Sequence, residues 1–112
     1  MSAIKIIAID IDATLLNSNH QLTDNVKNAI KSASKKGIKV VLTSGRPISG
    51  IRPFLKQLDL DDRNDQYVIS FGGGVVETTS GRIISARSLS YEDYLDLQNI
   101  ATKLGLHFHV ES

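Results

Sequence analysis

The first 70 residues alternate between short apolar runs and longer stretches whose apolar positions recur at helical spacing. The runs are rich in β-branched residues, which is typical of strands buried on both faces of a parallel sheet. They cover residues 4–9, 38–42 and 67–70, and the helical stretches cover residues 23–36 and 47–58. Strands that alternate with helices predict βαβ units with right-handed crossovers, and therefore an α/β fold with three parallel strands.

The residues after 70 follow a different pattern. β-branched segments on either side of Gly81 predict a hairpin, and Ser90 is placed to cap a helix that ends at Gly105. The predicted elements are the two hairpin strands, this helix and a last strand, over residues 75–78, 82–85, 90–105 and 106–110. We place a soft domain boundary in the hairpin, which divides the chain into residues 1–80 and residues 81–112.

Composition and charge exclude several classes of protein. The net charge is +1 without a basic stripe, so we expect no nucleic-acid partner. No apolar run approaches the roughly 20 residues that span a bilayer, so we expect no membrane partner either. The absence of cysteine excludes disulfides, thiolate zinc sites and a cysteine nucleophile, and it fits a reducing cytosol. We therefore expect a cytoplasmic protein.

Polar residues follow each of the three predicted parallel strands. Ligands of open α/β sheets bind beyond the carboxyl ends of the strands, so candidate chemistry is expected there. The three polar segments are residues 10–14, 43–46 and 70–74.

Asp10 and Asp12 form the most informative pair in these segments. Two carboxylates this close repel each other, which raises one pKa unless a cation lies between them. Hard oxygen ligands of this kind suit Mg²⁺. The spacing alone leaves two interpretations open, a metal-assisted nucleophile with its acid/base partner or a solvated turn at the end of a strand.

Two segments resemble motifs of the haloacid dehalogenase-like (HAD) phosphatases, in the Cof-type sugar-phosphatase branch. Asp10 to Leu16 resembles the first motif, usually Asp-x-Asp-Gly-Thr-Leu-Leu, and Val41 to Pro47 resembles the second-motif region, usually Thr-Gly-Arg-Pro. The resemblance covers nearly the whole chain. It implies a Rossmann-like HAD core fragment, followed by a hairpin and the start of an α+β cap.

The resemblance also implies a reaction. The family hydrolyses small phosphorylated metabolites, here a sugar phosphate, with Mg²⁺ as cofactor. By position, Asp10 would attack phosphorus to give an aspartyl-phosphate, and Asp12 would act as acid and base. Both carboxylates would lie beside the metal ion.

The other candidate site residues follow the second and third strands. Ser44 matches the phosphate-binding hydroxyl of the second motif, and Gly45 would present backbone amides to the same anion. Arg46 would either reach the phosphate or brace the loop. Gly72 and Gly73 fall in the expected substrate loop, where relatives commonly carry asparagine at the position of Gly72.

Three departures from the family pattern limit the expected activity. Ala13 replaces a glycine, which costs about 1 kcal/mol if that backbone has a positive φ. Gly72 lacks the asparagine side chain. The lysine and Gly-Asp-x-x-x-Asp motifs of the family have no counterpart in the 112 residues, so the active site is expected to be incomplete. We therefore expect turnover near background, and the alternative is a catalytically inactive truncated protein or a small interaction module.

The resemblance further predicts an exposed first strand. In the family's sheet this strand is central, and its second neighbour comes from a downstream segment that has no counterpart here. Ile4 to Ile9 would then form a bare apolar edge with Lys5 as its single charge, which is a template for pairing with another chain. We therefore expect a homodimer or another assembly that covers this strand.

Overall fold

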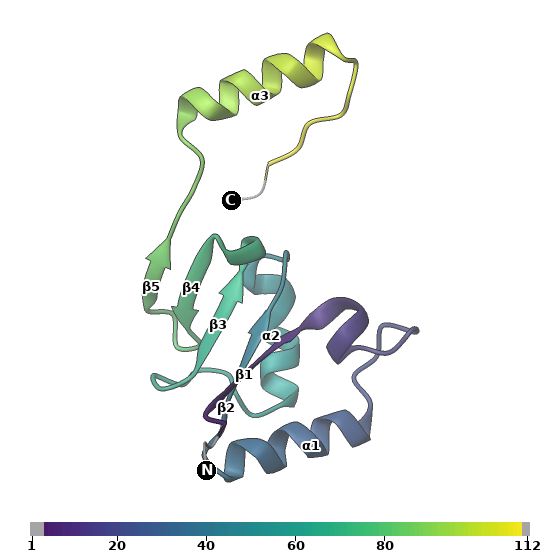
Figure 1. The fold of residues 1–112 in the computed structure, drawn as a ribbon, viewed down its shortest axis with the longest axis vertical. Helices are drawn as coiled ribbons and strands as arrows, with labels where there is room; N and C mark the ends of the chain where they lie inside the picture. The colour runs from purple at the N-terminus through teal and green to yellow at the C-terminus, as the bar shows by residue number, and fades with distance from the viewer. Residues whose placement is uncertain (1–3, 111–112) are drawn as a thin grey trace.

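The computed structural model describes residues 4–110, and its strands form one sheet in the order β1-β2-β3-β4-β5 (Figure 1). The strands are β1 (Ile6–Asp10), β2 (Lys39–Thr43), β3 (Tyr67–Ser70), β4 (Val75–Thr78) and β5 (Ile83–Ala86). The helices are α1 (Asp24–Lys35), α2 (Ile48–Gln57) and α3 (Tyr91–Lys103). None of the helices in the described part of the chain has the length and hydropathy needed to cross a membrane.

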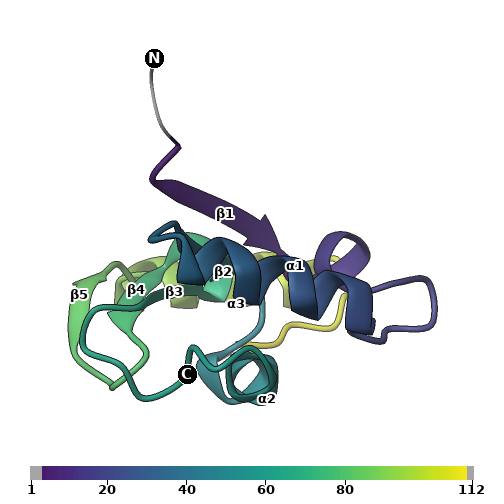
Figure 2. The ribbon, with the colours of Figure 1, turned by 90° about the horizontal axis from the view of Figure 1, so that it is seen from below.

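The sheet confirms the predicted α/β architecture. β1 pairs with β2 and β2 with β3 in parallel, whereas β4 and β5 continue the same sheet as an antiparallel hairpin. The register sets Asp10 beside Thr43, so the carboxyl ends of β1 and β2 lie level. In Figure 2 both α1 and α2 lie below β1, and Ile30 of α1 packs in one core cluster with Ile51 and Leu55 of α2. Both helices therefore cover the same face of the sheet, as two right-handed crossovers that advance in the same direction require.

Local sequence signals define the ends of α1 as predicted. The hydroxyl of Thr23 accepts a hydrogen bond from the Val26 amide at 3.4 Å, which caps the first turn. Gly37 has a φ of +86°, the left-handed conformation that commonly ends a helix. At α2 the prediction was one residue early, because Pro47 is the N-cap and Ile48 is the first helical residue.

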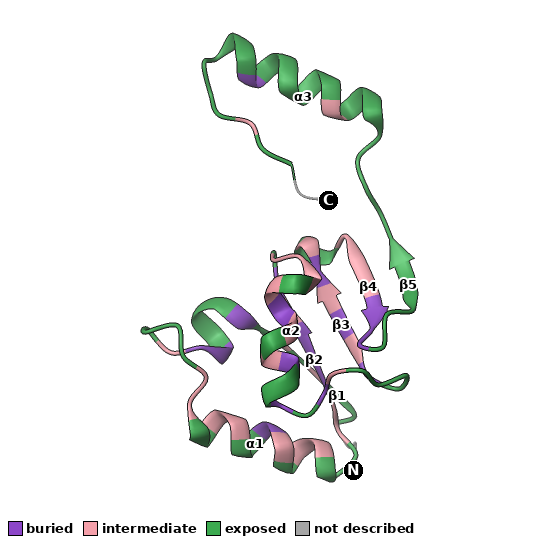
Figure 3. Ribbon diagram, turned by 180° about the vertical axis from the view of Figure 1, so that it is seen from behind, coloured by how far each residue is buried: buried purple, intermediate pink, exposed green. Residues whose placement is uncertain are grey.

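The buried core lies between the two helices and the parallel strands. Its fully buried side chains come from β2, α2, the loop after α2, β3 and the turn after β1 (Figure 3). They include Ile11, Leu42, Ile51, Leu55 and Val68, each with 0% of its surface exposed. Burying one leucine or isoleucine side chain contributes about 1.5–3 kcal/mol, so this cluster holds the site-bearing part of the chain together.

The C-terminal segment differs from the prediction at its end. The last strand predicted over residues 106–110 is wrong, because none of these residues pairs with a strand. After Gly105, whose φ is +68°, the Leu106 amide bonds to the Ala101 carbonyl at 2.8 Å, and the Phe108 ring packs on Tyr94 at 5.7 Å between centroids. The tail therefore folds back on α3 through its helix cap and an aromatic contact.

Candidate active site

The carboxyl ends of β1, β2 and β3 surround a cleft of about 270 Å³. It is lined by Asp10, Thr43, Ser44, Gly45, Ile69, Gly72 and Gly73. Five of the seven predicted site residues are thus brought together by strands far apart in the sequence. The other two, Asp12 and Arg46, do not line the cleft and instead bind each other.

Asp10 is held in place by the strand before it and the turn after it. It ends β1 in extended conformation, and the following turn, Ile11–Leu15, is closed by a hydrogen bond from the Leu16 amide to the Ile11 carbonyl at 3.1 Å. Ile11 and Leu15 are buried and anchor this turn in the core. Ala13 has a φ of +63°, so this position does require the conformation that favours glycine.

The loops after β2 and β3 are tied to each other by backbone hydrogen bonds. The Gly72 amide donates to the Ser44 carbonyl at 2.9 Å, and the Phe71 amide donates to the Arg46 carbonyl at 3.0 Å. Ser44 also donates its own amide to the Ile69 carbonyl at 3.0 Å. These bonds fix the spacing between the second-motif turn and the glycine turn that face each other across the cleft.

Ser44 keeps one hydrogen-bonding function for a ligand. Its side chain is nearly buried, and its hydroxyl oxygen accepts the Arg46 amide at 3.0 Å. A hydroxyl has one donor in addition to its lone pairs, so the Ser44 hydrogen can still donate to an oxyanion in the cleft. The predicted phosphate-binding role of Ser44 is therefore compatible with its structural role in the turn.

Asp12 and Arg46 form a bidentate ion pair at the rim of the site. Arg46 donates from Nη2 to Oδ1 of Asp12 at 2.7 Å and from Nε to Oδ2 at 3.1 Å. The hydrogen bonds from Arg46 lower the pKa of the Asp12 carboxyl below its ordinary value, and the same contact raises the pKa of Arg46. In this arrangement the lowered pKa favours the carboxylate form of Asp12, and Arg46 braces the first motif from the second.

Two residues of α2 that the motifs did not indicate hold Arg46 in this position. The guanidinium donates from Nη1 to the Gly50 carbonyl at 3.4 Å and lies 5.5 Å from the centroid of the Phe54 ring. A Cβ on Gly50 would come within 3.3 Å of the Arg46 Cβ, so the absence of a side chain makes room for the arginine stem. The available sequence signal was the spacing of residues 50 and 54, which places them on one face of α2 just after Arg46.

The glycine turn after β3 adopts conformations that favour glycine. Gly72 and Gly73 have φ values of +64° and +101°, and the turn is closed by the Gly74 amide, which donates to the Phe71 carbonyl at 3.1 Å. Asparagine tolerates the conformation of Gly72 better than most residues do, so the backbone here is compatible with the residue that relatives carry. The role of this turn in binding substrate remains a prediction.

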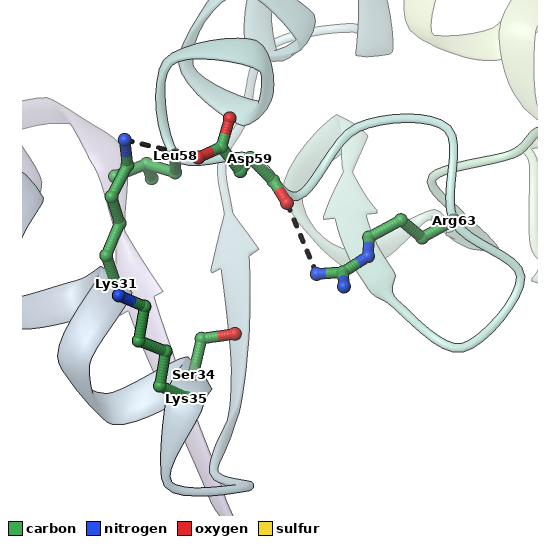
Figure 4. Close-up of a pocket in the computed structure, with 6 residues that line it drawn as sticks. All are labelled: Lys31, Ser34, Lys35, Leu58, Asp59 and Arg63. Carbon is green, nitrogen blue, oxygen red and sulfur yellow. Dashed lines mark hydrogen bonds and ion pairs between the residues drawn. The ribbon is translucent and has the colours of Figure 1, made fainter.

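A larger pocket of about 390 Å³ lies away from these strand ends, where α1 ends and the loop after α2 begins (Figure 4). Lys31, Lys35 and Arg63 give it a cationic lining. Two of these cations already bind Asp59, because Lys31 Nζ lies 3.2 Å from its carboxylate and Arg63 donates to its carbonyl at 3.2 Å. The pocket lies near the amino ends of β2 and β3, whereas ligands of open α/β sheets bind beyond the carboxyl ends, so it is the weaker candidate for chemistry.

The donors present suit a magnesium ion in kind but are few in number. Asp10 and Asp12 supply hard carboxylate oxygens, which Mg²⁺ prefers, and Mg²⁺ commonly keeps several waters beside one or two carboxylates. Asp12 is engaged by Arg46. No group of three or more His, Cys, Asp or Glu side chains that could hold a metal ion occurs within residues 4–110.

Comparison with known proteins identifies relatives over almost the whole chain. The family model described as haloacid dehalogenase-like hydrolase matches residues 7–112. A putative phosphatase of Streptococcus pyogenes serotype M6 is 40% identical over 96% of this chain and 40% of its own length, and the putative phosphatase YxeH of Bacillus subtilis is 40% identical over 94% and 39%.

Solved structures give the same result for the fold. A haloacid dehalogenase-like hydrolase from B. subtilis superposes with a TM-score of 0.79 at 30% identity, over 91% of this chain and 34% of that one. The chain thus spans about two fifths of the length of the curated relatives it matches.

Proposed function

Because the chain belongs to the haloacid dehalogenase-like hydrolases, we propose that it carries the nucleophile-bearing part of a magnesium-dependent phosphatase site. The proposed substrates are small phosphate esters, with sugar phosphates as the class suggested by the resemblance to the Cof-type branch. The observation that supports this proposal is the cleft at the strand ends, where Asp10 faces Ser44 and Gly45. The proposed place of action is the cytoplasm, consistent with a cysteine-free chain.

In the proposed reaction a carboxylate oxygen of Asp10 attacks the phosphorus of the ester. The bond from phosphorus to the leaving oxygen breaks, and that oxygen takes a proton from Asp12. Asp12 then removes a proton from water, which attacks the aspartyl-phosphate and releases inorganic phosphate. The Ser44 hydroxyl and the backbone around Gly45 would donate hydrogen bonds to the phosphoryl oxygens.

Arg46 would link substrate binding to the state of Asp12. The ion pair keeps Asp12 deprotonated, whereas protonation of the leaving group requires an acid. A phosphate dianion competes with the Asp12 carboxylate for the same guanidinium, because both offer two oxygens to its fork of donors. Binding of the substrate would thus release Asp12 to take up the proton that it later transfers.

Asp10 and Asp12 are the residues that would hold Mg²⁺, which would supply the positive charge that a transferring phosphoryl group needs. With two carboxylates, one of them paired with Arg46, we propose an affinity in the millimolar range or weaker, equivalent to about 4 kcal/mol or less. Among residues 4–110, no lysine or arginine side chain lines the cleft. Loss of one electrostatic stabiliser costs roughly 10²–10³ in rate, so turnover by this chain is expected to be near background.

The lack of a cation in the cleft also favours a second candidate function, that of a non-catalytic interaction module that keeps the fold. Magnesium titration followed by NMR distinguishes the two. If Asp10 binds Mg²⁺, the chemical shifts of Asp10 should change weakly and saturably as Mg²⁺ is added, and Asp10→Asn should abolish this change. The change should persist in Asp96→Asn, a control variant at an exposed position of α3. Micromolar affinity for Mg²⁺ would contradict a site made of two carboxylates alone. The same response in both variants would contradict magnesium binding at Asp10.

A further inference from the structure

Strand β5 ends at the same edge of the sheet as the strands that form the cleft. β4 is antiparallel to β3 and β5 is antiparallel to β4, so β5 runs in the direction of β1, β2 and β3. Figure 1 shows the chain leaving the sheet at this edge after β5. The first residue after β5 is Arg87, whose amide donates to the Gly74 carbonyl at 2.7 Å. Arg87 is therefore held beside the glycine turn of the candidate site.

The register of the sheet places Arg87 on the face that carries the cleft. One row of cross-strand partners runs through all five strands and consists of Asp10, Thr43, Ile69, Val76 and Ser85. The first three of these residues line the cleft. Cross-strand partners share a face, and side chains alternate along a strand. Arg87, two residues after Ser85, thus lies on the same face as Asp10.

The glycine turn leaves an open path from Arg87 to the cleft. Gly74 is opposite Arg87 in the β4–β5 ladder, and Gly72 and Gly73 line the cleft. A Cβ on Gly74 would lie 3.3 Å from the Arg87 carbonyl oxygen. Opposite residues in a ladder have Cβ atoms about 4.5–5.5 Å apart, so a side chain at position 74 would compete with Arg87 for the same space. The run of three glycines therefore places no side chain between Arg87 and the cleft.

The Arg87 side chain can accept a ligand in the part of the chain that the structure describes. It is exposed, and within residues 4–110 it forms no hydrogen bond or ion pair. Arg46, by contrast, is already held by Asp12. A guanidinium binds phosphate through two parallel hydrogen bonds, and a phosphate dianion attracts it more strongly than a single negative charge does. A phosphate group is therefore the ligand that suits Arg87.

The position of Arg87 determines which part of a substrate it can bind. The reacting phosphoryl group is proposed to lie at Asp10, Ser44 and Gly45, beyond the ends of β1 and β2. β5 is three strands away from β2, which at about 4.8 Å per strand is a separation of about 14 Å. An arginine side chain covers only part of this distance. A substrate that extends over the glycine turn would bring its far end, and not its reacting phosphate, to the guanidinium.

We propose that Arg87 is a specificity-determining residue that binds a second phosphate group of the substrate beside the glycine turn. The favoured substrates are then small bisphosphates, such as a sugar bisphosphate, because a sugar with one phosphate gains no contact with Arg87. This inference rests on the proposed phosphate site at Asp10, Ser44 and Gly45. It names which phosphate esters that site favours.

Arg82 provides a matched control for Arg87. Arg82 precedes β5 at the opposite edge of the sheet, and both arginines are exposed. Replacing either residue by glutamine removes one positive charge and keeps the backbone hydrogen bonds of the hairpin. A general effect of net charge on phosphate binding is therefore the same in the two variants, whereas a contact beside the cleft distinguishes them.

NMR titration of the full 112-residue chain with fructose monophosphate and fructose bisphosphate, in the presence of Mg²⁺, tests the proposal. Dissociation constants are measured at the Ser44 and Gly45 amides. Arg87→Gln is expected to bind the bisphosphate about fivefold more weakly than Arg82→Gln does, the upper end for an exposed ion pair. The two variants are expected to bind the monophosphate equally. In wild type, the Nε–H signal of Arg87 should shift with the bisphosphate and not with the monophosphate.

The titration separates failure of this inference from failure of the proposed phosphate site. Suppose that the monophosphate shifts the Ser44 and Gly45 amides, but the two variants bind the bisphosphate equally well. The role of Arg87 is then overturned, and the phosphate site stands. If neither compound shifts these amides in any of the three proteins, the phosphate site is wrong, and the inference that rests on it is wrong as well.

Discussion

The part of the chain through β4 and the part from β5 onward carry similar sequence signals but reach different degrees of burial. α1, which Thr23 caps, and α2, which begins after Pro47, pack their apolar faces on β2 and β3. α3 is also capped, by a hydrogen bond from the Asp93 amide to the Ser90 hydroxyl at 3.1 Å, yet Ala101 is its single buried residue. Figure 3 shows β5 and α3 exposed along almost their whole length.

The difference separates what local sequence determines from what packing determines. Caps and spacing are enough to define a helix, but its apolar side needs a partner surface before it contributes to stability. No described element covers the apolar side of α3. Its residues Leu97 and Ile100 and its C-cap residue Leu104 are therefore 42–65% exposed. We keep the division at residues 80 and 81 as a proposal, with β5 as the strand that joins the sheet to the exposed part.

The largest effect expected from this comparison is on global stability. Leu55→Ala in α2 removes a fully buried side chain and should lower the free energy of unfolding by about 3 kcal/mol. Leu97→Ala in α3 removes a side chain that is 42% exposed and should change it by less than about 1 kcal/mol. Denaturant unfolding measures both. Equal losses would mean that α3 is packed in solution.

A smaller effect concerns backbone strain in the first motif. Ala13→Gly should raise the free energy of unfolding by about 1 kcal/mol, because φ at this position is +63°. Ala29→Gly in the interior of α1 should lower it by about 0.5–1 kcal/mol, since glycine is a poor helix former. If both substitutions destabilised the protein, the turn at Ala13 would not be strained.

The smallest effect is electrostatic and local. Arg46→Gln removes the donor that lowers the pKa of Asp12, so that pKa should rise towards its ordinary value. A carboxyl pKa that is lower in the folded state than in the unfolded state stabilises the fold at pH values above the ordinary carboxyl pKa. This contribution disappears as the pH falls through the pKa of the folded state. NMR titration of the Asp12 carboxyl carbon measures the change. Asp65, whose pKa is lowered by Lys39, is the internal control and should not move.

Much of the fold and the candidate site could be predicted from sequence. β-branched runs and caps defined the elements to within a residue or two, and strand ends indicated where polar residues would converge. The cleft formed by Asp10, Ser44 and Gly45 depends on parallel pairing alone, so the alternation of strands and helices was enough to predict it.

What could not be predicted depends on contacts between distant residues. The partner of Arg46 was left open because sequence does not show whether a guanidinium faces Asp12 or solvent. The tail at residues 106–110 has the pattern of a strand, but a strand also needs an edge to pair with, and here the tail packs on Tyr94 through Phe108. Residues whose role depends on the local sequence, such as helix caps and strand ends, were predicted well. Residues whose role depends on contact with a residue far away in the sequence, such as Arg46, were not.

The most direct test of the phosphate site is an NMR titration of the amides with inorganic phosphate, with and without Mg²⁺. In wild type we expect amide shifts at Ser44, Gly45, Gly72 and Gly73 that require Mg²⁺, because the Asp10 carboxylate repels an unneutralised anion. In Asp10→Asn the same shifts should occur without Mg²⁺, and α3 should not respond in either protein. Shifts confined to the pocket of Lys31, Lys35 and Arg63, or none at the strand ends, would contradict it.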